Sequence, residues 1–137
     1  MHMEITYQIE KDLSVQEFID CLKSSTLAER RPMEDTERLA LMVRNADIMI
    51  TARYDGQVVG VARSVTDYAF TCYLSDLAVD QAFQGKGIGK ELMRQTANAV
   101  PGVKVHLMSA PAAIEFYEKL PIEKWPHCYR FTDQTEF

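Results

Sequence analysis

The sequence contains no long apolar run, and no stretch approaches the ~20 residues that a helix needs to cross a membrane. Its first residues lead into an alternating pattern and lack the basic and apolar segments of a signal peptide. Cysteine is scarce, since Cys21, Cys72 and Cys128 stand far apart and form no C-x-x-C pair. An odd, scattered set of this kind is typical of free thiols in a reducing compartment. We therefore expect a cytoplasmic protein with no membrane partner.

Basic residues are in the minority. The chain has 15 Lys and Arg against 20 Asp and Glu, and its net charge of −5 does not fit the basic surface of a nucleic-acid-binding protein. Internal repeats and linkers are also absent from the 137 residues, a length typical of one compact domain. We expect a single domain over residues 1–137 with no nucleic-acid partner.

Metal ligands at a suitable spacing are missing as well. His106 alternates with apolar neighbours in a predicted strand, and His127 precedes Cys128 without further ligands nearby. Structural zinc sites use about four ligands at defined spacings. The sequence therefore predicts no metal site.

Glycine is also scarce, but three of the six glycines stand at alternate positions, Gly85, Gly87 and Gly89. They lie between a predicted strand that ends at Val79 and a predicted helix. Glycine lets the backbone approach a ligand closely, and the start of a helix adds unpaired N–H groups and the positive end of the helix dipole. This combination predicts a phosphate-binding loop. A flexible connector is the alternative.

The loop matches neither of the two commonest phosphate motifs. A Walker loop needs Ser or Thr after Gly89-Lys90, where this chain has Glu91, and a dinucleotide fingerprint needs a different glycine spacing. Lys86, Lys90 and Arg94 concentrate positive charge here in an otherwise acidic chain, which favours an anionic cofactor. Solvated helix charges are the alternative, above all for Arg94.

The run Gln84-Gly85-Lys86-Gly87-Ile88-Gly89 resembles the (Q/R)-x-x-G-x-(G/A) signature of the GCN5-related N-acetyltransferases, the GNAT family. The resemblance is specific over about residues 74–122. It implies acetyl-coenzyme A as the co-substrate, with its pyrophosphate held by the loop. The cofactor-binding residues that it implies are Leu77, Ala78 and Val79 in the strand and Gln84, Gly85, Lys86, Gly87, Ile88, Gly89 and Lys90 in the loop.

Hydrophobic periodicity predicts the order of the elements. Alternating residues predict strands at 5–9, 48–54, 57–65, 68–79, 103–107 and 128–132, and residues 24–33 are predicted to form a loop. Helices are predicted to begin after Ser14, at Asp35 or Thr36, after the glycine loop, and at Pro111. The order β-α-α-β-β-β-α-β-α-β matches the GNAT fold. That fold is of the α/β (α+β) class, a twisted mixed sheet of about six to seven strands flanked by about four helices.

Acetyl transfer to an amine requires a held thioester, a polarised carbonyl group, a neutral amine and a proton for the leaving thiolate. By resemblance, the pantetheine arm pairs with the backbone of Leu77 and Val79, and one of these N–H groups stabilises the oxyanion. Residues 113–119 resemble the family's A-x-x-x-Y helix, which implies that Tyr117 protonates the thiolate. A phenol with a pKa near 10 suits that task. Packing is the alternative role for Tyr117.

The sequence does not identify the general base, because no glutamate stands between Phe70 and Val79. Asp76 is a candidate catalytic residue on this strand, and alternation places its side chain on the opposite face from that of Leu77. It could accept a proton through water or hold a cationic substrate. Alternatively, it could bond the backbone N–H groups of a strand bulge.

The expected function is an N-acetyltransferase that transfers an acetyl group directly to a primary amine of a small molecule or a protein. The alternative is a catalytically degenerate GNAT-like module that binds coenzyme A as a sensor or an interaction domain. Arg30 and Arg31 could bind an anionic group of the acceptor or could be solvated. The sequence is also compatible with a homodimer. The acceptor itself is not specified by the sequence.

Overall fold

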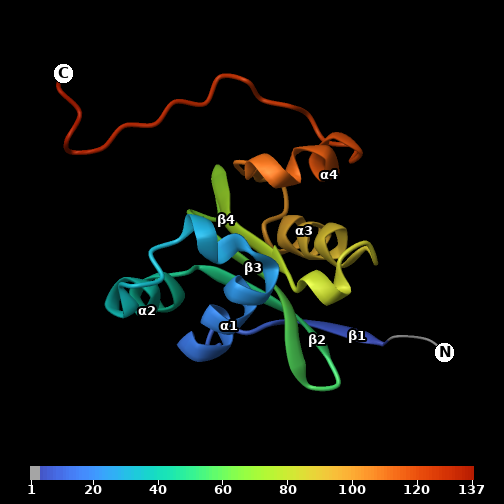
Figure 1. Ribbon diagram of the computed structural model, residues 1–137. Coiled ribbons are helices and arrows are strands. Elements are labelled where there is room, and N and C mark those ends of the chain that lie inside the picture. The colour runs from blue at the N-terminus through green and yellow to red at the C-terminus, as the bar shows by residue number, and fades with distance from the viewer. Residues whose placement is uncertain (1–3) are drawn as a thin grey trace. The chain divides into compact units, whose positions relative to one another are not determined.

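The computed structural model describes residues 4–137 (Figure 1). They form two compact units, of which the first ends at Leu107 and the second spans Met108–Phe137. None of the helices found in residues 4–137 is long and apolar enough to cross a membrane. The elements of the first unit are β1 (Ile5–Ile9), α1 (Val15–Ser25), α2 (Thr36–Arg44), β2 (Ile48–Tyr54), β3 (Gln57–Thr66), β4 (Thr71–Val79), α3 (Ile88–Ala99) and β5 (Lys104–His106). The second unit holds α4 (Ile114–Glu118).

The five strands lie in the order β1-β2-β3-β4-β5. The pairs from β1 to β4 are antiparallel, and β5 pairs with β4 in parallel. This parallel pairing joins Lys104–His106 to residues 71–73 only. Among the strand pairings of residues 4–137, the β5 side of β4 therefore has no partner from residue 74 to 79.

Two apolar cores lie on opposite faces of the sheet (Figure 1). On one face, Phe18 of α1 and Leu39 of α2 pack with Met49 of β2. On the other face, Leu92 of α3 packs with Ile50 of β2. Met49 and Ile50 are neighbours in one strand and belong to different cores, as the alternation of strand side chains requires.

Helix α3 packs directly on β3 at Gly60. A Cβ atom at this position would lie 3.1 Å from Cδ1 of Leu92 and 3.3 Å from Cγ2 of Ile88. Contacts this close leave little room for a side chain. Gly60 therefore lets α3, including its first residue, sit close to the sheet.

The predicted starts of α1 and α2 are confirmed by their caps. The Ser14 Oγ atom accepts a hydrogen bond from the Glu17 N–H group at 3.1 Å, at the start of α1. At the start of α2, Asp35 Oδ1 accepts from the Arg38 N–H group at 3.0 Å, so Asp35 is the cap. Each bond satisfies an N–H group that has no partner within its helix.

The predicted strand count was too high. The structure has five strands in residues 4–137, against about six to seven, and the strand predicted at residues 128–132 is irregular. Alternation shows only that a segment suits a strand, whereas a strand forms when its backbone groups pair with a neighbour. The second unit, which contains this segment, holds no strand that could supply such a partner.

The strand predicted at 68–79 begins later, at Thr71. The side chain of Asp67 competes for the backbone here, since its Oδ1 atom accepts hydrogen bonds from the N–H groups of Ala69, Phe70 and Thr71. Such bonds favour a turn over a strand. Tyr68, with a φ of 60°, also has a turn conformation.

Two further boundaries differ from prediction. The segment 24–33, expected to be a loop, contains the end of α1 and a 3₁₀ turn at Leu27–Arg30. Between them, Thr26 has a φ of 76°, which ends α1. The helix expected from Pro111 begins as the 3₁₀ turn Pro111–Ala113 and becomes α-helical in α4.

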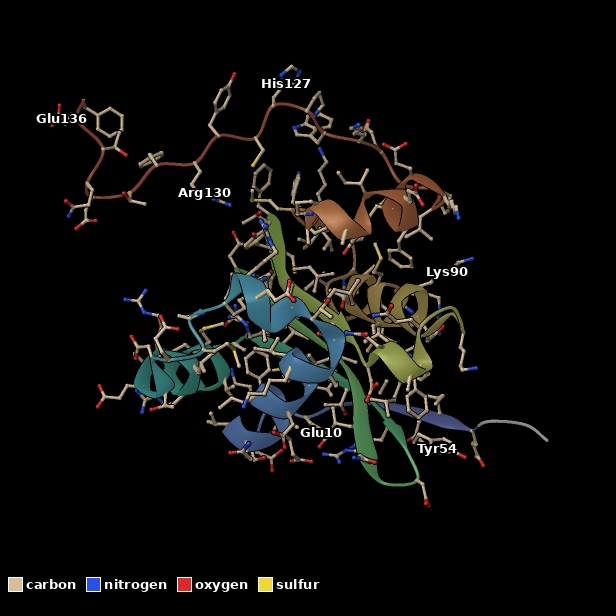
Figure 2. The ribbon with its side chains drawn as sticks, in the orientation of Figure 1. Glu10, Tyr54, Lys90, His127, Arg130 and Glu136 are labelled. Atoms are coloured by element: carbon tan, nitrogen blue, oxygen red, sulfur yellow. The ribbon has the colours of Figure 1, made fainter. Side chains whose placement is uncertain are left out.

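A charged network joins β2 to the start of α1. The Arg53 Nε and Nη2 atoms donate to the two carboxylate oxygens of Glu10, each at 2.8 Å, and Nη1 lies 3.0 Å from Glu17 Oε2. The hydrogen bonds from Arg53 lower the pKa of Glu10 to about 2, against an opposing effect of burial, and Thr51 adds to the lowering. Glu10 lies close to α1 (Figure 2).

We predict that Glu10→Gln lowers the free energy of unfolding at pH 7 by about 2–3 kcal/mol, because Arg53 loses one of its two ionised partners. The folded-state pKa of Glu10 lies below the ordinary value of 4.5, so its contribution is complete above pH 4.5 and is lost as the pH falls toward 2. Urea unfolding should show the parent and the variant converging over this range. Glu29→Gln, at an exposed position, is the control. A constant difference from pH 7 to pH 2 would contradict the assignment.

Candidate functional site

The glycine loop begins at the end of β4 and is tied back to it. Asp80 Oδ1 accepts a hydrogen bond from the Ala82 N–H group at 2.9 Å, which caps a short 3₁₀ turn. Gln84 Nε2 then donates to the carbonyl oxygen of Val79 at 3.0 Å. The side chain of the first residue of the motif therefore fixes the loop to the last residue of β4.

Two of the three glycines have left-handed backbones. The φ angles of Gly85 and Gly87 are 77° and 82°, a region that side chains disfavour. A Cβ atom at either position would meet no protein atom within 4 Å, so the space beside the loop is open. Gly89 lies in the first turn of α3 and does not have a positive φ.

The loop leads into an uncapped helix. Gly87 is the N-cap of α3 and offers no side-chain acceptor, and the Glu91 N–H group is the first to bond within the helix, to the Gly87 carbonyl oxygen at 3.0 Å. The N–H groups of Ile88, Gly89 and Lys90 therefore have no acceptor inside the helix. They and the helix dipole favour an anion at this end.

The positive charges around the loop differ in their partners. Lys86 and Lys90 are exposed, and Lys90 lies at the loop end of α3 (Figure 2). Arg94 is paired with Glu91, with Nε 2.9 Å from Oε1. This pairing favours a structural role for Arg94 and leaves the two lysines to supply positive charge.

The β4 residues of the site alternate between the two faces of the sheet. Leu77 and Val79 are half-buried and pack on the α3 side. Ala78 belongs to the core on the α1 side, where its carbonyl oxygen lies 3.9 Å from the Cys21 Sγ atom. Leu77 and Val79 also lie in the part of β4 that β5 does not cover.

Asp76 is fully buried, and each of its carboxylate oxygens accepts a hydrogen bond from an arginine. Oδ1 accepts from Arg31 Nε, and Oδ2 accepts from Arg63 Nε. Arg31 is thus neither solvated nor free to bind an acceptor with its whole guanidinium group. Sequence reasoning missed Arg63. Arg63 stands inside an apolar strand, and a charged residue is rarely buried there without a partner. That position could have indicated an ion pair.

Tyr117 lies in the second unit, on α4. Its side chain is half-buried, and its ring lies 5.0 Å from that of Phe116 in an edge-on arrangement. Burial raises the pKa of Tyr117 above its ordinary value of 10.0. The geometry of the first unit brings Asp76, the β4 residues and the glycine loop together, and it does not include Tyr117.

Residues 4–137 contain no group of three or more His, Cys, Asp and Glu side chains arranged to hold a metal ion. Cys21 and Cys72 are buried, and burial raises the pKa of Cys21 to about 12. Cys128 and His106 are exposed.

Comparison with known proteins assigns the family. The sequence model of the Acetyltransferase (GNAT) family matches residues 11–120. The chain belongs to this family. GCN5-related N-acetyltransferase 1, chloroplastic, from Arabidopsis thaliana is 29% identical over 107 residues, which cover 74% of this chain and 54% of the relative. The chain spans about half the length, or less, of the curated relatives it matches.

Solved structures share the GNAT fold. A GNAT family acetyltransferase from Streptococcus pneumoniae has a TM-score of 0.75 at 19% identity, covering 94% of this chain and 96% of that one. The aminoglycoside N-acetyltransferase AAC(6')-Iy in complex with CoA has a TM-score of 0.70 at 14% identity, covering 98% of both chains. The mixed sheet with helices on both faces is thus the fold of this family.

We predict that Gly87→Val lowers the affinity for coenzyme A by roughly tenfold or more, about 1.4 kcal/mol. The side chain would occupy the open space beside the loop, where the pyrophosphate is expected. Backbone strain alone should cost ~1–3 kcal/mol of stability. Titration calorimetry measures the affinity.

Gly102→Val is the matched control, because Gly102 has a φ of 78° and a Cβ atom there would also meet nothing within 4 Å. Both variants should be destabilised to a similar extent, and the Gly102 variant should keep the parent affinity. Equal affinities in the two variants would mean that the glycine loop is only a connector.

Proposed function

We propose that this chain is an acetyl-coenzyme A-dependent N-acetyltransferase that acts on a primary amine. The observation that carries the proposal is the continuity of three features in one segment. The uncovered edge of β4 leads into the loop at Gln84–Gly89, and that loop opens the uncapped helix α3. An extended ligand with amides at one end and phosphates at the other fits such a segment.

In this proposal the loop and α3 hold the pyrophosphate. The N–H groups of Ile88, Gly89 and Lys90 point in the direction of the helix N-terminus, where they would donate to phosphate oxygens. Lys86 and Lys90 would add charge. The pantetheine amides would pair with the backbone of Leu77 and Val79, alongside Ala78, on the edge that β5 leaves free.

The transfer itself is direct. The nitrogen of a neutral amine attacks the thioester carbonyl carbon, and the carbonyl oxygen gains negative charge, which a β4 N–H group of Leu77 or Val79 would stabilise. The carbon–sulfur bond then breaks, the acetylated nitrogen loses a proton to water, and the thiolate gains one. We assign the last proton to the phenol of Tyr117.

The family and the chemistry support an amine as the acceptor. The structural neighbour AAC(6')-Iy is named an aminoglycoside N-acetyltransferase, and the Arabidopsis relative is named an N-acetyltransferase. These names support an amine acceptor on a small molecule or a protein. The cytoplasmic location stays a prediction from the cysteine pattern, and the Arabidopsis relative is named as chloroplastic.

A thiol-release assay with the purified protein and a panel of small-molecule and peptide amines tests this function. Calorimetric titration with acetyl-coenzyme A should first show binding. At about 100 times the dissociation constant, bound cofactor should add roughly 2.7 kcal/mol of stability. Binding with no amine that accelerates thiol release would favour the degenerate coenzyme A-binding module. No binding at millimolar cofactor would contradict both functions.

We predict that Tyr117→Phe lowers turnover by about 10²–10⁴-fold, the usual size of a general-acid contribution. Cofactor affinity should stay within a few-fold, because the substitution keeps the ring and removes only the hydroxyl group. Burial raises the pKa of Tyr117 above 10.0. The phenol of the parent should therefore stay protonated, and the parent should stay active, up to about pH 10.

Tyr129→Phe is the control in the same unit, where Tyr129 is 87% exposed. It should behave as the parent does. If Tyr117→Phe alters only the melting temperature, the tyrosine packs and does not act as the acid.

A further inference from the structure

The ladder between β3 and β4 contains a bulge at Ser75. Arg63 pairs with Asp76 and Ser64 pairs with Leu74, so Ser75 lies between them without a partner on β3. The parallel pairing with β5 has already ended, at residue 73. Among the strand pairings of residues 4–137, Ser75 therefore has no partner on either side, and its backbone groups need other hydrogen-bond partners.

Two arginine side chains bind Ser75, one at its backbone carbonyl oxygen and the other at its side-chain hydroxyl group. Arg31 Nη2 donates to the Ser75 carbonyl oxygen at 2.8 Å, and Arg63 Nη2 donates to Ser75 Oγ at 2.9 Å. The same two arginines bind Asp76, one to each carboxylate oxygen. We call this group, Arg31, Arg63, Ser75 and Asp76, the bulge clamp.

The bulge clamp is shielded from water. The side chain of Asp76 is 0% exposed, that of Arg63 is 10% exposed and that of Arg31 is 20% exposed. Charge-assisted hydrogen bonds of this kind are strong, and the fork of a guanidinium group fixes the direction of each. Removing one partner leaves a buried charge without compensation.

Arg31 comes from outside the sheet. It follows the 3₁₀ turn Leu27–Arg30, in the connection between α1 and α2, and its Nη1 atom also donates to the Arg30 carbonyl oxygen at 2.8 Å. One side chain therefore joins this connection to the bulge. Leu77 directly follows Asp76, and its N–H group is a candidate donor to the oxyanion. Arg31 therefore acts on this residue through the bulge.

We propose that Arg31 and Asp76 are positioning residues, which hold the bulge of β4 so that the Leu77 backbone faces the thioester. A bulge bends its strand and increases the local twist, and its angle here depends on the side chains that satisfy Ser75. The proposal rests on the proposed acetyl transfer. It gives Asp76 a role that needs no proton transfer.

Arg31→Lys tests the bulge clamp, because lysine keeps the charge and loses the fork that reaches both Asp76 and Ser75. Turnover should fall by about 10- to 100-fold, the cost of a displacement of about 1 Å in a reacting geometry. The KM for acetyl-coenzyme A should change by less than about threefold, because the glycine loop is not altered. Arg30→Lys, at the exposed neighbouring position, is the matched control and should behave as the parent does.

Asp76→Asn separates positioning from proton transfer. The amide has the size of the carboxylate, but it can accept from only one arginine and directs a donor at the other. Turnover should fall while the shape of the pH profile stays that of the parent. If the acidic limb disappears in Asp76→Asn while Arg31→Lys keeps the parent turnover, Asp76 is the base and the proposal is wrong. It is also wrong if both variants merely melt earlier and turn over normally when folded.

Amide hydrogen exchange over residues 74–79 provides a test that does not need turnover. Exchange should be faster in Arg31→Lys and Asp76→Asn than in Arg30→Lys, and equal rates would overturn the proposal. A parent protein that acetylates no amine would count against the proposed function instead, and the exchange measurement would still decide whether the clamp holds β4.

Discussion

The early end of the parallel ladder between β4 and β5 is the constraint on which the site depends. Backbone amides that lose a strand partner need another acceptor or donor, and in the proposed function an extended ligand would supply it along the β4 edge beyond residue 73. The glycine loop begins where this edge ends, held there by the bond from Gln84 to Val79. One continuous piece of backbone therefore changes from strand edge to loop to helix N-terminus, and in the proposed function each part would offer N–H groups to a different part of the same ligand.

Apolar packing holds both faces of the sheet, and the face of α1 and α2 has buried ion pairs in addition. On the face of α1 and α2, ion pairs of Glu10 with Arg53 and of Asp76 with Arg31 join helix-side segments to strands. On the other face, α3 is held by apolar packing of residues such as Ile88 and Leu92. Ionic contacts depend on direction and apolar contacts depend on area. The ion pairs of Asp76 thus fix β4 from one face, while apolar packing holds α3 on the other.

Local signals explain which parts could be predicted from the sequence. Asp55-Gly56, between the strands predicted at 48–54 and 57–65, is a local hairpin signal, and both residues have the positive φ angles that such turns require. The glycine loop, the α1 cap and the family signature are local in the same sense. The bulge at Ser75 shifts the alternation by one residue, so that Leu74 and Leu77 face the same core, and the prediction of one continuous strand over 68–79 did not account for this shift. Arg31, which binds Asp76, stands 45 residues away from it in the sequence, and no periodicity relates two such positions. The strand predicted at 128–132 was wrong because pairing is a property of two segments.

Gly60 has a consequence that reaches beyond packing. The absent side chain lets the first turn of α3 rest on β3, where Ile88 Cγ2 would be 3.3 Å from any added Cβ atom. Ile88 directly follows Gly87, the last loop glycine with a left-handed backbone. The height of the loop above the sheet therefore depends on β3, which lies two strands from β5 at the edge of the sheet. Because Ile88 and Leu92 both lie against Gly60, any movement of the start of α3 would also disturb the packing on the middle of the sheet.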